Sequence, residues 1–299
     1  MTVLLRIREA IRDFYARFEV YITPVIKFVM ALVTFLLINS SLGYWGKLSS
    51  KALALVVALL CSFLPMNFMI LFATVFVLAH LYKLSLEIMI FVLAIFLLMY
   101  LLFFRFSPRD TFAVLLTPVC FVLKIPYVIP LVLGLVGTPY SLVSVSCGCV
   151  SYYLLHFVHE NSEAILAMDK DGSLTRFKYI VDGFMHDRKM VVMIFAMIVC
   201  ILVTYYVRRL SLDYSWQIAI GCGALSHLAA LFLGDLMFKA YFSVPMAFCS
   251  MIVCVLIAFV VQFMLFNLDY RKTEKVQFED DEYYYYVKAV PKKLSEKEK

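Results

Sequence analysis

Long runs of apolar residues, separated by shorter polar stretches, make up most of the sequence. A helix needs about 17–25 apolar residues to cross a hydrocarbon layer of about 30 Å. Runs of that length lie at 22–42, 86–104, 139–158, 190–207, 216–238 and 243–266. The pattern predicts an all-α, polytopic helical membrane protein with about six full spans, for which the lipid bilayer is the solvent.

Two further apolar segments, 52–81 and 111–137, are interrupted by proline and polar residues. The first breaks at 65–67, and the second breaks at 124–126 and again at 137–139. Because proline removes a backbone donor and clashes with the preceding turn, each half keeps only about 11–15 apolar residues, too few to span. We expect each segment to form either a re-entrant pair of short helices or one kinked span. Paired, interrupted segments also point to the substrate region of a transporter.

The first 21 residues carry a different pattern from the spans. Apolar residues recur at steps of three and four from Leu4 to Phe18, and basic residues fill most of the gaps. This periodicity predicts an amphipathic helix that lies in the headgroup plane. Four arginines between residues 6 and 17 favour the anionic cytoplasmic surface. The segment resembles the elbow helix that precedes the first span in the membrane subunits of ABC-type transporters.

Composition supports the membrane assignment. The 299 residues are 64% apolar and 16% charged, with a mean hydropathy of +0.91. A soluble domain carries about 25% charged residues, and its core could not absorb this apolar excess. The net charge is +6, but the basic residues form no long stripe, which argues against a nucleic-acid partner. All 8 cysteines lie in apolar stretches, where they behave as small packing residues.

Charge also orients the chain. Residues 267–299 form a polar tail, and its basic pair Arg271 and Lys272 directly follows the last span, as is typical of the cytoplasmic side. With both termini cytoplasmic, the transmembrane domain (22–266) must cross an even number of times, which six spans and two re-entrant segments satisfy. The polar loop 159–189 then lies outside a plasma membrane, although its five basic residues conflict with that side.

Polar side chains at membrane depth are candidates for a substrate or ion path, because burying them in lipid is costly. Lys124 lies at the second break, where it needs an anionic partner unless it reaches the headgroups and snorkels. His227 and Asp235 lie eight residues apart, on roughly one face of the 216–238 helix, as a proton or cation relay would. The alternative for Asp235 is an ordinary ion pair with Lys239 at i+4.

A short run of histidines and acids follows the 139–158 span. His156, His159, Glu160 and Glu163 lie on one helical face, and imidazoles with carboxylates can bind zinc or another divalent ion. The run is not H-E-x-x-H, so it lacks the zinc-protease pattern. The alternative is a solvated helix end with interfacial histidines.

The tail contains the sequence FEDDEYYYYVKAVPKK at 278–293. Its consecutive tyrosines, Tyr283, Tyr284, Tyr285 and Tyr286, favour a strand that could dock on a partner's sheet, or else lie at the headgroups. Residues 269–292 resemble the tail of an uncharacterised family of bacterial polytopic membrane proteins that sometimes carry a generic permease label. The resemblance implies no established activity, so no functional residue is carried over from it.

Two functions fit these patterns. The first is a permease-like membrane protein, in one form the membrane subunit of a transporter powered by a separate ATPase, since the chain has no P-loop or Rossmann motif. The second is a non-transporting scaffold of a cell-envelope complex that docks a partner through the tail. An enzyme would need a convergent acid, base or metal set, and only the 156–163 run approaches one. We expect no cofactor.

Overall fold

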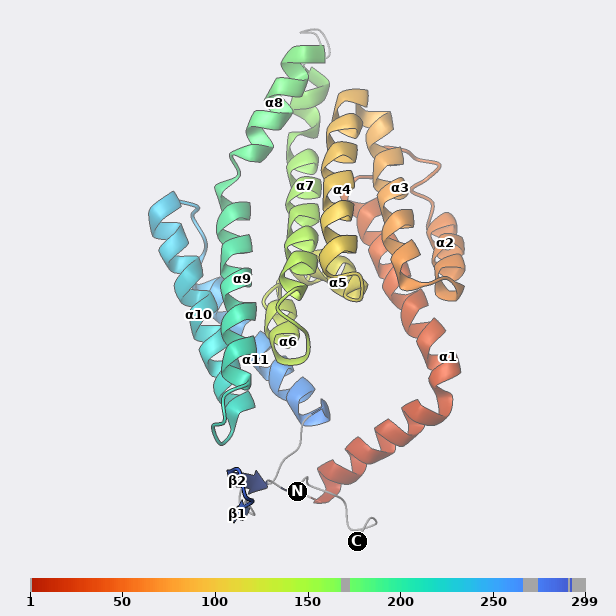
Figure 1. The fold of residues 1–299 in the computed structure, drawn as a ribbon. Coiled ribbons are helices and arrows are strands. Elements are labelled where there is room, and N and C mark those ends of the chain that lie inside the picture. Colours follow the sequence, from red (N-terminus) through yellow and green to blue (C-terminus); the bar gives the residue numbers. More distant parts are fainter. Residues whose placement is uncertain (1, 168–172, 266–273, 290, 292–299) are drawn as a thin grey trace.

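The computed structural model describes residues 2–167, 173–265, 274–289 and 291 and is built almost entirely of helices (Figure 1). The helices are α1 (Thr2–Ser41), α2 (Lys51–Phe63), α3 (Met66–Leu84), α4 (Leu86–Phe106), α5 (Thr111–Val122), α6 (Val128–Val136), α7 (Ser141–Ala167), α8 (Ser173–Met185), α9 (Arg188–Arg208), α10 (Ser215–Phe238) and α11 (Val244–Leu265). Two strands follow, β1 (Glu274–Glu279) and β2 (Tyr284–Ala289). The all-α polytopic prediction is confirmed.

Seven helical stretches in the described residues are long and apolar enough to cross a membrane, one more than predicted. The additional one is α3, which has 19 residues and continues past the expected end at 81 to Leu84. Pro65 is the N-cap of α3 rather than a kink inside it, and proline tolerates that position because it has no hydrogen bond to lose there. The expectation that both halves of 52–81 are too short is therefore wrong for the second half. The first half, α2, has 13 residues and reaches about 20 Å.

Large apolar side chains cover the outside of the bundle. On α10 alone, Leu225, Leu233, Leu236 and Met237 are 62% to 78% exposed. Water would solvate such a surface at a cost of about 25 cal/mol for each Å² of apolar area, whereas lipid solvates it readily. The chain is therefore an integral membrane protein that crosses the bilayer several times.

Small residues allow the helices on one side of the bundle to approach closely. Thr204 of α9 packs between Gly134 of α6 and Gly223 of α10. A Cβ atom at Gly223 would lie 2.0 Å from Thr204 Oγ1, and one at Gly134 would lie 2.6 Å from Thr204 Cβ. Helices in lipid gain stability mainly from such close packing, because lipid offers no hydrophobic drive between them. These contacts join α6, α9 and α10 into one tightly packed unit. We call the packing of Thr204 between Gly134 and Gly223 the Thr204 contact.

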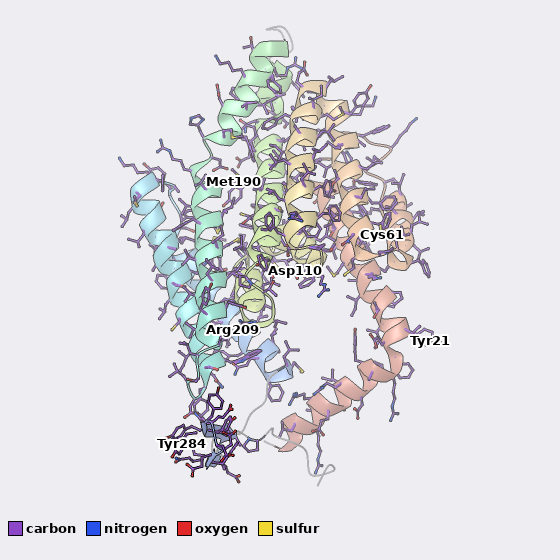
Figure 2. All side chains as sticks on the ribbon, viewed as in Figure 1. Tyr21, Cys61, Asp110, Met190, Arg209 and Tyr284 are labelled. Carbon is purple, nitrogen blue, oxygen red and sulfur yellow. The ribbon has the colours of Figure 1, made fainter. Side chains whose placement is uncertain are left out.

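The predicted interfacial helix and the first span are two parts of α1. Phe18 has non-helical backbone angles (φ −113°, ψ 17°), and Figure 2 shows the bend close to Tyr21. Before the bend, the apolar stripe that includes Ile11 and Phe14 is about half exposed, as a headgroup-plane helix requires. Arg8 is buried instead, and its Nε donates to the carbonyl of Met264 at the end of α11 (3.2 Å).

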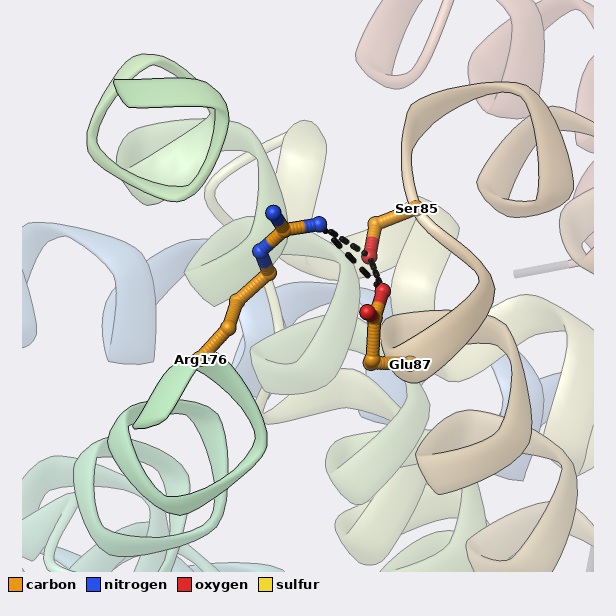
Figure 3. A network of polar contacts seen from close by, with 3 residues as sticks. All are labelled: Ser85, Glu87 and Arg176. Atoms are coloured by element: carbon orange, nitrogen blue, oxygen red, sulfur yellow. Dashed lines mark hydrogen bonds and ion pairs between the residues drawn. The ribbon is translucent and has the colours of Figure 1, made fainter. Parts of the chain in front are cut away.

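The polar loop predicted at 159–189 is mostly helical, which corrects that prediction. The helix α7 continues to Ala167, and α8 packs on α4 through Phe91, whose ring lies 5.9 Å from that of Phe184. Arg176 of α8 is only 7% exposed, and its guanidinium donates to Glu87 Oε2 (3.3 Å) and Ser85 Oγ (3.4 Å) at the start of α4 (Figure 3). An arginine that conflicted with the charge-based topology is thus held in a partly buried ion pair.

The tail forms a two-stranded antiparallel hairpin, in which Glu279 pairs with Tyr284. On β2, Lys288 contacts Asp213 in the turn between α9 and α10 (2.5 Å). The hairpin and the start of α1 lie at the same end of the bundle (Figure 1). Seven crossings alone would leave these segments on opposite sides of a membrane, so α2 supplies the return between α1 and α3. Which side is cytoplasmic stays a prediction.

Candidate functional site

A cavity of about 980 Å³ opens between the helices, at the top of the size range of ligand pockets. One wall comes from α1, α3 and α4 and is mostly apolar. The other wall comes from α5 and the turn after it, from α7, from Gly183 of α8, and from the starts of α9 and α11. All the charged or imidazole-bearing residues of the lining lie on this second wall: Lys124, His156, His159, Glu160, Asp187 and Lys189.

The broken segment 111–137 lies at the centre of this arrangement. It forms two short helices, α5 and α6, of 12 and 9 residues, as expected for a re-entrant pair rather than for one kinked span. The helix α5 packs mainly on α7, and α6 packs mainly on α9. Non-helical backbone at membrane depth is tolerated only where protein buries it or a cavity borders it. The turn between α5 and α6 meets that condition, because Lys124, Pro126 and Tyr127 all line the cavity.

A Schellman motif ends α5 and fixes the position of Lys124. The Lys124 amide donates to the carbonyl of Phe121 (3.0 Å), and the Ile125 amide donates to that of Cys120 (2.9 Å). Pro126 then prevents the helix from continuing. Lys124 occupies the position that glycine usually takes, with φ of 61°. A lysine here costs about 1–2 kcal/mol relative to glycine, and strain of this kind is concentrated at functional sites.

An aromatic column runs along the charged wall. The rings of Phe121 and Tyr152 stack with centroids 4.4 Å apart, and those of Tyr152 and His156 stack with centroids 5.7 Å apart. His156 Nε2 lies 3.1 Å from Glu160 Oε1. Tyr152, His156 and Glu160 are spaced four residues apart on α7, so one helix face carries them all into the cavity.

The carboxylates of the charged wall have partners, whereas its lysines do not form an ion pair within the described residues. Glu160 contacts His156. Asp187 is the N-cap of α9, and its Oδ1 accepts from the amides of Lys189 (3.0 Å) and Met190 (3.3 Å). Lys124 and Lys189 expose their side chains without a carboxylate within ion-pair distance in that part of the chain. The wall therefore offers two ammonium groups that have no ion-pair partner in the described residues.

Four of the five hydroxyl groups on the apolar wall, all but that of Ser41, form hydrogen bonds to backbone carbonyls of the bundle. Thr34 Oγ1 donates to the Met30 carbonyl (2.8 Å), and Thr74 Oγ1 donates to the Ile70 carbonyl (2.9 Å). Tyr100 OH contacts Thr74 Oγ1 and also donates to the Ile70 carbonyl (3.0 Å). A hydroxyl that is already bonded to its own helix offers little to a polar ligand. This wall therefore presents mainly hydrocarbon to whatever occupies the cavity.

Asp110 anchors the start of α5, and sequence reasoning missed it. Figure 2 places it near the centre of the molecule, where its Oδ2 accepts from Ser107 Oγ (2.7 Å) and Ser141 Oγ (2.5 Å). Thr111 Oγ1 donates to Asn67 Oδ1 at the start of α3. The signal was present only for other residues of this network, because Asn67 lies in the predicted break at 65–67 and Ser141 lies just after the one at 137–139. The network holds the two breaks together and fixes one end of the broken segment.

The structure does not bring His227 and Asp235 to the cavity. His227 is fully buried, and its Nδ1 donates to the Ala196 carbonyl (3.1 Å). Tyr127, which lines the cavity, packs against the imidazole with centroids 4.5 Å apart. Asp235 Oδ1 accepts from the Phe242 amide (3.4 Å), a contact that orders the turn between α10 and α11. No ion pair joins Asp235 to Lys239 in the described chain.

The metal site predicted at 156–163 is not assembled. Within the described residues, no group of three or more histidine, cysteine or acidic side chains is arranged to hold a metal ion. His156, His159 and Glu160 line the cavity, whereas Glu163 does not. The pairing of His156 with Glu160 uses both groups in an ordinary contact four residues apart.

The tyrosines of the tail fall into different environments. Tyr284, Tyr285 and Tyr286 belong to β2, and Tyr283 precedes it. Tyr285 shares one face of the hairpin with Glu274, Val276, Phe278, Val287 and Ala289, according to the register. Apart from Glu274 at its edge, this face is apolar and exposed, whereas Lys288, which contacts Asp213, lies on the other face.

Asp280 shapes the turn of the hairpin. Its Oδ1 accepts from the amides of Glu282 (2.9 Å) and Tyr283 (2.7 Å), and its Oδ2 accepts from Tyr285 OH (2.9 Å). These hydrogen bonds, first those from the two amides, lower the pKa of Asp280 below its ordinary value. The same contact raises the pKa of Tyr285, because the phenol donates to a carboxylate.

Comparison of the chain with models of known protein families, with curated proteins and with solved structures gave no match. The resemblance of the tail to a permease-like family therefore stays an expectation. Function has to be argued from the cavity and the hairpin themselves.

Proposed function

We propose that this integral membrane protein is a permease, and that its substrate passes through the cavity beside α5 and α6. The observation that carries the proposal is a pair of short apolar helices, α5 and α6, whose connecting turn borders a large cavity. Transporters build substrate sites from such discontinuous helices, because the interrupted backbone and its side chains face a path rather than lipid.

The position of Lys124 supports the same function. A scaffold needs only a stable bundle, and glycine would end α5 at lower energy than a left-handed lysine. A path for an anionic substrate requires an unpaired cation at that position, and the backbone strain is then offset by function. A separate ATPase is one source of energy for such transport, as the absence of a P-loop in this sequence suggests.

Thiol accessibility tests the permease function without knowledge of the substrate. Cys147, Cys222 and Cys249 are replaced by serine, and the five remaining cysteines are buried and stay in place. Ser151→Cys, and separately Ser243→Cys, then places a single reactive thiol on the cavity lining, because Ser243 is exposed and Ser151 is partly exposed. A membrane-impermeant thiol reagent is applied to right-side-out and to inside-out vesicles.

A permease exposes its path alternately to the two sides, so both vesicle types should be labelled at these positions. Ser226→Cys is the matched control, because Ser226 lies on α10 outside the cavity lining and should be labelled from neither side. Labelling of both cavity positions from one side only, or from neither, would contradict a transport path.

A second candidate function, a scaffold that docks a protein partner, is favoured by the exposed apolar face of the hairpin. An isolated two-stranded hairpin is marginal in water, and Val276 and Phe278 are about half exposed. The hairpin carries five acidic and two basic residues between 274 and 289, so anionic headgroups would repel it. Phe278→Ser should abolish co-purification with such a partner, whereas Tyr286→Ser, on the opposite face, should leave it unchanged.

A further inference from the structure

We infer that the cavity binds an amphipathic anion, with its hydrocarbon part along the wall of α1, α3 and α4 and its anionic head on Lys124. The inference rests on the proposed permease function, because it names the substrate class of that same cavity. The described lining has two chemically different walls, and a ligand that fits both must itself have two different parts.

The ammonium groups of the second wall, rather than its net charge, indicate the sign of the head group. Each carboxylate on that wall is engaged, Glu160 by His156 and Asp187 by the amides at the start of α9. Lys124 and Lys189 are not paired with a carboxylate in the described residues. An anion would complete the coordination of an ammonium group with charge-assisted hydrogen bonds, whereas a cationic ligand would meet unpaired lysines.

Lys124 is the better placed of the two lysines. Lys189 belongs to the first turn of α9, where its backbone amide is already used by Asp187 and its side chain lies at a helix end. Lys124 projects from the turn between α5 and α6, next to Pro126 and Tyr127 on the lining. The Schellman hydrogen bonds hold its backbone in one conformation, so less conformational entropy is lost when an anion binds.

The apolar wall sets the nature of the other part. Its hydroxyl groups at Thr34, Thr74 and Tyr100 are bonded within the wall. Most of the remaining lining of this wall comes from apolar side chains such as Ile70, Phe96 and Phe103. A small hydrophilic anion would leave this surface unused, whereas an alkyl chain would gain about 0.8 kcal/mol for each CH₂ group it buries. The shared chemistry is that of a lipid phosphate or of a free alkyl phosphate.

The test uses the full chain in nanodiscs of phosphatidylcholine, with binding heats measured against empty nanodiscs. Three probes are used. Dodecyl phosphate carries both the chain and the anionic head, dodecanol carries the chain alone, and inorganic phosphate carries the head alone. The variants are Lys124→Asn, which removes the charge but tolerates a left-handed backbone, and Lys124→Arg, which keeps the charge. Lys239→Asn is the matched control, because Lys239 is also a left-handed lysine but lies outside the cavity lining.

We expect Lys124→Asn to weaken dodecyl phosphate about tenfold or more, the effect of losing one charge-assisted contact. Lys124→Arg should stay within about threefold of the original protein, and Lys239→Asn should not change the affinity. Dodecanol and inorganic phosphate should each bind much more weakly than dodecyl phosphate. The inference is wrong if Lys124→Asn retains full affinity, or if either partial probe binds as tightly as dodecyl phosphate.

The same experiment separates this inference from the permease function. Loss of dodecyl phosphate binding in Lys124→Asn, together with one-sided labelling of Ser151→Cys, would leave a ligand site in a protein that does not transport. Two-sided labelling with unchanged binding in Lys124→Asn would keep the permease and overturn the amphipathic anion.

Addition of phosphatidic acid to the nanodiscs distinguishes the two sources of the ligand. If a membrane lipid is the ligand, phosphatidic acid should compete with dodecyl phosphate in the original protein. If the ligand is a free alkyl phosphate, dodecyl phosphate should retain its affinity. Either result supports the amphipathic anion and assigns its source.

Discussion

The Thr204 contact and the cavity beside Lys124 both involve the broken segment 111–137, but the first is closely packed and the second is open. At the Thr204 contact, α6, α9 and α10 approach so closely that a single Cβ atom at Gly223 has no room. At the turn between α5 and α6, which lies directly before α6, the helices leave about 980 Å³ open. One segment therefore has a packed end and an open end.

Polar residues in the two regions differ in the same way. His227, near the packed region, is fully buried and donates to a backbone carbonyl. Lys124 is exposed to the cavity and forms no ion pair in the described residues. Depth in the membrane alone therefore does not identify a functional side chain. Access to a cavity, together with an unused charge, separates the path residue from the structural one.

The largest effect should come from filling the Thr204 contact. Gly223→Ala places a methyl group 2.0 Å from Thr204 Oγ1 and should lower the free energy of unfolding by about 3 kcal/mol, as over-packing does. Gly221→Ala, two residues earlier on α10, meets nothing within 4 Å and should leave stability unchanged or raise it by up to about 1 kcal/mol. Equilibrium unfolding in mixed micelles measures both, and equal values would argue against the close approach.

The next largest effect should come from removing Arg176, a cation that is paired with Glu87, unlike the unpaired Lys124. Arg176→Met leaves Glu87 in a partly buried position without its guanidinium and should cost about 2–3 kcal/mol, less than a fully buried pair would. The double variant Arg176→Met with Glu87→Met should recover most of that loss, because an apolar pair replaces the ion pair. Protease cleavage within α8 reports the detachment of this helix, and Lys178→Gln, on an exposed part of α8, is the control.

A smaller effect of opposite sign is expected at Lys124 itself. Lys124→Gly relieves the left-handed backbone and should raise the free energy of unfolding by about 1 kcal/mol, while it removes binding of dodecyl phosphate. Lys239→Gly should raise stability similarly and leave binding intact. A Lys124→Gly protein that is both less stable and fully able to bind would contradict the assignment of strain to function.

The smallest effect concerns the hairpin, far from both regions. The pKa of Asp280 is lowered in the folded hairpin, so its contribution to stability is present above the ordinary pKa of aspartate and is lost as the pH falls through the lowered value. The pKa of Tyr285 is raised, so its contribution is present below the ordinary pKa of tyrosine and is lost as the pH rises through the raised value.

Amide hydrogen exchange of residues 274–289 in the intact protein measures this pH dependence. Asp280→Asn should remove the acidic loss of protection and should open the hairpin at neutral pH, because an amide accepts the two backbone hydrogen bonds more weakly. Asp281→Asn, at the neighbouring position of the turn, should have no such effect. Identical exchange in both variants would contradict the conclusion that Asp280 stabilises the turn of the hairpin.

The apolar pattern was sufficient to predict the class of fold and the positions of the helix breaks. Runs of apolar residues and prolines act locally, so the breaks at 65–67 and 124–126 were visible in the sequence. The full length of α3 was missed because Pro65 was interpreted as an interruption, although it begins the helix. The helix α8 was missed because its few apolar contacts, such as Phe177 and Phe184, are separated by charged residues.

The candidate site was only partly predictable. Lys124 stood out because a polar group near lipid is costly, and His156, His159 and Glu160 stood out as possible metal ligands on one helical face; all four line the cavity. Their convergence with Asp187 depends on how α7 and α9 pack, which no local pattern encodes. His227 showed the same local signal as Lys124, yet the close packing of α9 and α10 excludes it from the cavity.

The most direct test of the central claim combines the cavity with its lysine. The rate at which Ser151→Cys reacts with an impermeant thiol reagent is measured with and without dodecyl phosphate, in proteins with Lys124 and with Lys124→Asn. We predict that dodecyl phosphate slows the reaction when Lys124 is present and has no effect when asparagine replaces it. Equal protection in both proteins, or protection in neither, would contradict the claim that Lys124 holds a ligand in this cavity.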